Sequence, residues 1–270
     1  MYINSTSISE LTDSLCHAFQ KSDEQLYSDL SNIAYDSKDE DVLRSNINKY
    51  VKENLVDKPN KVLLFHLSRR LDNDDNDLTG YSLVNLLTFK NSYSDFLLKH
   101  HLSFKYNNGH IDIYYYDKKV ELDNSNDNDL ILMKRLGYNK NIKDFCFNGF
   151  IINPVIGKNT YISSLSLGSE LTQRLADLIN NKSMIDEYIN KSTYYCFKYL
   201  VPIDIVLFDE KPALNKNSKI IYMMGKYIDF FITYFIYQQR EKTSTDIEIR
   251  LNDYEDLLSE YYIDKIIIEK

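Results

Sequence analysis

The chain has 270 residues, of which 43% are hydrophobic and 27% charged, so it can bury a sizeable core and is neither disordered nor fibrous. Its formal net charge is −8, and no run of lysines or arginines is present, which argues against strong nucleic-acid binding. The three cysteines, Cys16, Cys146 and Cys196, lie far apart and lack zinc-ligand spacing. We therefore expect reduced thiols, a cytoplasmic setting and no metal site.

The N-terminal part of the sequence predicts helices. The pattern S-x-x-E at residues 7–10 is a capping box, and apolar residues recur at helical spacing through residues 5–35. A second helix is expected over 41–55. The N-terminus lacks the basic and apolar regions of a secretory signal. These features predict a helical segment, residues 1–56, followed by an α+β main domain, residues 57–270.

The main domain begins with the segment KVLLFHLSRRL, residues 61–71. Its apolar run follows a turn signal at Pro59-Asn60 and predicts a strand over 61–68 that is buried on both faces. In an extended segment His66 and Ser68 share one face, and Arg69 lies on the other. A histidine near a hydroxyl and two cations fits the floor of a ligand pocket, and it also fits ordinary core packing.

The next elements are a helix and a hairpin. A helical pattern over residues 81–101, with a break near Asn91, precedes the β pattern of residues 103–122. The turn Asn107-Asn108-Gly109 and the alternation that follows it predict a three-stranded meander with tyrosines on its polar face. A further strand, residues 144–152, contains a glycine that indicates close approach of backbone or ligand.

The second half of the chain predicts helices over 169–180 and 183–190 and a strand over 194–208. Pro202 in that strand indicates an edge or a bulge, because proline has no backbone N–H. Two later strands are expected, at residues 247–251 and 261–268.

Residues 220–237 form a nearly continuous apolar and aromatic run. Lys226 and Asp229 lie in its middle, where each charge would cost about 2.5–3.5 kcal/mol in lipid. We therefore predict a buried core helix and no membrane span. Taken together, the elements predict an α+β fold in which a mixed, mostly antiparallel sheet is flanked by helices, after a helical N-terminal segment.

Polar residues stand at the ends of three predicted strands: His66 with Ser68, Tyr161 with Ser163, and Glu248. In this order the chain resembles the ADP-ribosyltransferase family, in the branch with a His-Tyr-Glu triad. The matching segments are FHLS (65–68), GKNTYISSLS (157–166) and DIEIR (246–250), and YLVPIDIVLFD (199–209) is similar to the mid-domain strands of such toxins.

The resemblance implies catalytic roles for three residues. His66 would hold the ribose of NAD, Tyr161 would stack on nicotinamide, and Glu248 would bind a ribose hydroxyl and favour an oxocarbenium-like transition state. The position two residues before Glu248 holds Asp246, where the family has glutamate or glutamine. The identity of the modified residue therefore stays open.

The resemblance also implies a binding site for NAD, which would be the substrate. Arg69 or Arg70 would contact its pyrophosphate, because a guanidinium binds such groups in a bidentate manner. Ser68 and Ser163 would lie beside the bound dinucleotide.

Two functions follow. The first is an NAD-dependent ADP-ribosyltransferase-like toxin or effector that is delivered into a host cell and modifies a host macromolecule, with a host protein as its target. The alternative is a non-catalytic phage or pathogen protein that blocks a host defence factor through a tyrosine-rich surface, since tyrosine combines a large contact area with few rotors. The enzyme requires Glu248 in the same cleft as His66, whereas the binding protein requires its exposed tyrosines to form one patch.

Overall fold

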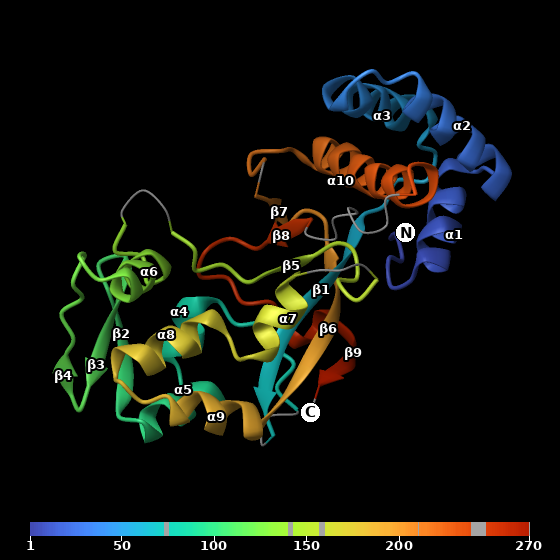
Figure 1. Cartoon of the computed structure of the whole chain (residues 1–270). Coiled ribbons are helices and arrows are strands. Elements are labelled where there is room, and N and C mark those ends of the chain that lie inside the picture. Colours follow the sequence, from blue (N-terminus) through green and yellow to red (C-terminus); the bar gives the residue numbers. More distant parts are fainter. Residues whose placement is uncertain (73–75, 140–142, 157–159, 210, 239–246, 270) are drawn as a thin grey trace. The chain divides into compact units, whose positions relative to one another are not determined.

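The computed structural model describes residues 1–270 except 73–75, 140–142, 157–159, 210, 239–246 and 270. The described residues form a six-strand antiparallel sheet, a three-strand sheet and surrounding helices (Figure 1). The predicted α+β class with N-terminal helices is therefore confirmed.

The chain divides into two compact units. Unit 1 comprises Met1–Phe65, Gly149–Thr160 and Lys198–Arg250, and unit 2 comprises His66–Asn148, Tyr161–Phe197 and Leu251–Lys270. The predicted helical segment 1–56 belongs to unit 1, and its boundary with the main domain stays a prediction.

The helices of unit 1 are α1 (Ile8–Phe19), α2 (Asp23–Tyr35), α3 (Glu40–Asn54) and α10 (Lys216–Phe231), which continues as the π-helical turn η1 (Ile232–Ile236). The single helix predicted over residues 5–35 is wrong, because the chain breaks between α1 and α2. Gln20 adopts a left-handed φ of 52°, and Ser22 then caps α2 in a capping box with Gln25. The helix predicted over 41–55 is confirmed as α3.

Helix α10 is the predicted core helix. Its buried residues include Met223, Met224 and Tyr227, and it packs against α3 (Figure 1). Gly225 lies at this contact, where an added Cβ would be 3.6 Å from Ile47. No helix within the described part of the chain is long and apolar enough to cross a membrane.

The strands of the larger sheet are β1 (Lys61–Leu71), β5 (Asn148–Phe150), β6 (Ser192–Pro202), β7 (Leu207–Phe208), β8 (Glu248–Arg250) and β9 (Tyr262–Glu269). Their order is β7-β8-β5-β1-β6-β9 (Figure 1). The strand predicted over 194–208 is divided, because β6 ends at Pro202 and the chain turns before β7. The proline is thus accommodated at a strand end, and β6 is not the predicted edge strand.

Strand β5 is shorter than the strand predicted over 144–152, and it lies very close to β1. Phe150 pairs with Phe65 in antiparallel register. A Cβ added to Gly149 would lie 2.5 Å from the carbonyl oxygen of Phe65, closer than atoms can approach. The predicted close approach is confirmed, and the approaching group is backbone.

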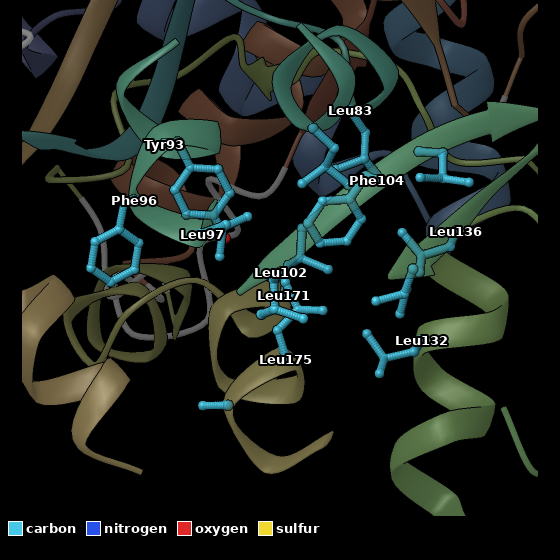
Figure 2. Packing of buried hydrophobic residues seen from close by; sticks show 14 of the residues in the cluster. Leu83, Tyr93, Phe96, Leu97, Leu102, Phe104, Leu132, Leu136, Leu171 and Leu175 are labelled. Carbon is cyan, nitrogen blue, oxygen red and sulfur yellow. The ribbon is translucent and has the colours of Figure 1, made fainter. Parts of the chain in front are cut away.

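Unit 2 contains the predicted meander and its helices: β2 (Leu102–Asn107), β3 (His110–Tyr115), β4 (Lys118–Lys119), α4 (Leu83–Thr88), α5 (Ser92–Lys99), α6 (Asp127–Arg135), α8 (Glu170–Leu178) and α9 (Ser183–Asn190). One face of the meander enters the core, where Phe104 belongs to the same hydrophobic cluster as Leu136 and Leu171 (Figure 2). Each fully buried leucine or phenylalanine here contributes about 2 kcal/mol of hydrophobic stabilisation.

Candidate functional site

Strand β1 carries four of the predicted site residues and divides them between its two faces. His66, Ser68 and Arg70 are half-buried, whereas Leu67 and Arg69 between them are buried. Successive side chains of a strand point to opposite faces. The expectation that His66 and Ser68 share a face, with Arg69 on the other, is therefore confirmed, and Arg70 belongs to the face of His66.

His66 is held in one protonation state by its surroundings. Its Nδ1 lies 2.7 Å from the carbonyl oxygen of Asn148, which can only accept, so Nδ1 carries the hydrogen. Burial, and then the charge of Arg70, lower the pKa of His66 to about 4 despite that hydrogen bond. The ring also packs on Phe147, with centroids 4.3 Å apart. At neutral pH His66 thus presents Nε2 as a hydrogen-bond acceptor.

Arg69 joins elements of unit 2. Its Nη1 donates to the backbone carbonyl of Ser192 at 3.2 Å, and its Nη2 donates to the carbonyl of Ser166 at 2.8 Å. The guanidinium lies 5.6 Å from the ring centroid of Tyr194, and the residue is 7% exposed. These contacts connect β1 with β6 and with the end of helix α7 (Thr160–Ser166).

Arg70 lies on the other face, over a different aromatic ring. Its guanidinium is 5.2 Å from the ring centroid of Phe197, and its Nη2 donates to the carbonyl of Thr79 at 2.9 Å. The ammonium of Lys265 on β9 lies 4.4 Å from the centroid of Tyr195 and 6.0 Å from that of Phe197. Two cations, Arg70 and Lys265, therefore lie against Tyr195 and Phe197 on this face of β6, and the sequence did not indicate the contact of Lys265.

Tyr161 and Ser163 lie in helix α7, not in the connection before a helix where the sequence placed them. The side chain of Tyr161 lies outside the described residues. The carbonyl of Ser163 accepts a hydrogen bond from the Ser166 hydroxyl at 2.7 Å. The contact of Arg69 with Ser166 brings α7, and with it the backbone of these two residues, next to β1.

Glu248 is half-buried on β8 and belongs to unit 1, whereas the other predicted site residues belong to unit 2. Strand β8 pairs with β7, with Ile249 opposite Phe208. Arg250 forms an ion pair with Asp209 at 2.7 Å. The neighbouring Asp246 lies outside the described residues.

A second polar cluster, which sequence reasoning missed, surrounds Asp112 on β3. Its Oδ1 accepts hydrogen bonds from Lys119 at 2.9 Å and from His110 and Tyr138 at 3.0 Å, while Oδ2 accepts one from Asn107 at 3.1 Å. Burial raises the pKa of Asp112, but the hydrogen bonds from Lys119, Asn107 and Tyr138 and the charge of Lys119 outweigh it and lower the pKa to about 2. The alternation of β3 predicted the shared polar face and gave no sign of Tyr138.

A hollow of about 590 Å³ lies in unit 2 beside the end of β1. That volume falls within the range of small-molecule sites. Its lining residues include Leu71, Phe96, Lys99, Glu187 and Lys191, and none of the predicted site residues is among them.

No group of three or more His, Cys, Asp or Glu side chains among the described residues could hold a metal ion. Comparison with protein-family models, with curated proteins and with solved structures finds no match for this chain. The ADP-ribosyltransferase-like assignment therefore stays a prediction.

The neutral state of His66 predicts a pH dependence of stability. Its folded pKa of about 4 lies below the ordinary 6.5, so the unfolded chain binds the proton more tightly. The stability is present above pH 6.5 and is lost as the pH falls through 4, by about 2 kcal/mol, less than the full shift implies because the residue is partly exposed. Urea unfolding at pH 7 and near pH 4 measures this loss.

His66→Gln removes the titrating group, so the variant should lose less stability than the wild type over that pH range. His17→Gln is the matched control, because the side chain of His17 is 69% exposed. If His66→Gln and the wild type show the same pH dependence, the assigned neutral state is wrong.

Proposed function

We propose that the chain is an NAD-dependent ADP-ribosyltransferase-like toxin or effector that modifies a host macromolecule. The observation that carries the proposal is the common face of His66, Ser68 and Arg70 on β1. A neutral imidazole with a free acceptor, a hydroxyl and a guanidinium in this order suit the ribose and pyrophosphate of a dinucleotide.

In the proposed reaction, His66 Nε2 accepts a hydrogen bond from a ribose hydroxyl, and Arg70 rather than Arg69 contacts the pyrophosphate. Arg69 is already bonded to the carbonyls of Ser166 and Ser192. Ser68 and Ser163 border the dinucleotide, and Tyr161 stacks on the nicotinamide.

The bond that breaks joins the ribose anomeric carbon to the nicotinamide nitrogen, which leaves with the electron pair. A nucleophilic group of the host macromolecule takes its place and loses its proton to solvent. Positive charge develops on the ribose, and the carboxylate of Glu248 stabilises it. The proposed target is a host protein, reached after delivery into the host cytoplasm.

The first test is incubation of the purified chain with NAD and host lysate, with measurement of released nicotinamide and of mass shifts in host proteins. Glu248→Gln keeps the size of the side chain and removes its charge. Release should fall by about a hundredfold or more, because the charge that stabilises the transition state is lost.

Glu53→Gln is the matched control, since Glu53 is an exposed glutamate of the same unit, on α3. It should release nicotinamide at the wild-type rate. Absence of release from the wild-type chain, together with no thermal stabilisation by NAD, contradicts the proposed enzyme.

Variants of Arg69 and Arg70 should distinguish an effect on NAD binding from an effect on the stability of the free protein. Arg70→Met should abolish the rise in Tm that NAD causes, while its aliphatic chain still covers Phe197. Arg69→Met should lower the Tm of the free protein, because the buried carbonyl of Ser192 and the partly buried carbonyl of Ser166 lose their donor, and should keep the response to NAD. Differential scanning fluorimetry with and without NAD measures both, and equal responses of the two variants to NAD would refute the assignment.

A second candidate function is the non-catalytic block of a host factor, and one observation favours it. Tyr106 and Tyr254 are 43% and 41% exposed, their rings meet edge to face at 5.7 Å, and their hydroxyls are 3.0 Å apart. Both rings also contact the buried Phe145, so they form a fixed aromatic surface on unit 2. Aromatic groups held in this way are typical of binding hot spots.

If this surface binds the host factor, the double variant Tyr106→Ser/Tyr254→Ser should weaken capture of that factor at least tenfold in a pull-down with measured affinity. Tyr116→Ser is the control, because Tyr116 is 57% exposed and stacks on His101 instead. Equal capture by the wild type and the double variant removes this surface from consideration.

A further inference from the structure

Strand β9 is the last strand in the order of the six-strand sheet. It pairs with β6, and no described strand follows it on the other side. A strand at this position presents backbone N–H and C=O groups along its outer edge, which can pair with another strand.

Strand β9 contains one uninterrupted apolar run, the three isoleucines at residues 266–268. No residue from Tyr262 to Ile268 is buried, and Ile263 and Ile267 are 48% and 49% exposed. Ile266 and Ile268, on the face opposite Ile267, are half-buried. Charge or proline ordinarily interrupts exposed edge strands. In β9 the charges of Asp264 and Lys265 precede the run, and residues 266–268 themselves contain neither charge nor proline.

The sequence of β9 is complementary to itself in one antiparallel register. A two-fold axis perpendicular to the sheet at Ile267 sets Ile267 opposite its own copy and Ile266 opposite Ile268 of the second chain. Directly opposed residues share a face, so both faces gain apolar pairs. The same register sets position 265, a lysine, opposite position 269, a glutamate in the sequence.

We propose that the outer edge of β9 binds the β9 strand of a second copy of this chain, in the antiparallel register centred on Ile267. The self-complementary run and the opposed charges at its ends select a second copy over an unrelated strand. The paired segment is short, and interfaces well below about 1,200 Å² belong to weak complexes. The dimer should therefore form at micromolar concentrations and dissociate on dilution.

The test is sedimentation velocity of the full chain from low micromolar to near-millimolar concentration. The wild-type mass should rise from the monomer value of 31.9 kDa towards twice that value. Ile267→Lys places two ammonium groups opposite each other at the two-fold axis. Its dimerisation should be at least tenfold weaker, because like charges directly opposed are destabilising.

Two control variants distinguish this register from a dimer contact elsewhere on the chain. Leu258→Lys introduces the same charge at an exposed leucine outside β9 and should dimerise as the wild type does. Ile263→Lys lies outside the paired segment 265–269 and should also keep the dimer. Equal Tm values for the monomeric forms of all variants show that they fold.

Several outcomes would overturn the proposal. A wild-type chain that stays at 31.9 kDa over the whole range excludes the dimer. An Ile267→Lys variant that dimerises as strongly as the wild type places the interface elsewhere. An Ile263→Lys variant that loses the dimer as fully as Ile267→Lys does overturns the register.

Discussion

The larger sheet depends on the close contact between β5 and β1. Gly149 lies so near β1 that a Cβ would be 2.5 Å from the Phe65 carbonyl oxygen and 2.6 Å from the Leu64 side chain. Strand β5 has three residues, yet it stands between β1 and the β8-β7 pair in the strand order. The absence of a side chain at one position therefore allows the last two strands of that edge to join the rest of the sheet.

Much of the fold could be predicted because its signals are local. The Asn107-Asn108-Gly109 turn fixed the hairpin, and the apolar density of residues 220–237 identified the core helix. The break between α1 and α2 was overlooked although Ser22 and Gln25 carry a local capping signal. The short length of β5 had no such signal, because it is set by pairing with residues more than 80 positions away in sequence.

The candidate site could likewise be predicted only in part from the sequence. The period of a strand was sufficient to separate Arg69 from His66 and Ser68. The partners of these residues were not predictable, since Asn148, Ser166 and Ser192 are contributed by distant segments and mostly through backbone carbonyls. Every residue has a backbone carbonyl, so the sequence does not indicate which carbonyl will accept a given hydrogen bond. The four donors around Asp112 likewise come from three strands, β2, β3 and β4, and from the segment after α6.

The adjacent arginines Arg69 and Arg70 affect how β1 reaches its correct register during folding. A slip of β1 by a single residue would exchange its two faces. In the slip that moves Arg70 into the place of Arg69, beside Ser192 and Tyr194, Leu71 would replace Arg70 over Phe197. The position over Tyr194 would still hold an arginine, so the slipped pairing would keep one of the two arginine–aromatic contacts. His66 also distinguishes the two registers, because the same slip would place Leu67 at the Asn148 carbonyl and leave that acceptor without its donor. The hydrogen bond of His66 to the Asn148 carbonyl would then favour the correct register of β1 during folding.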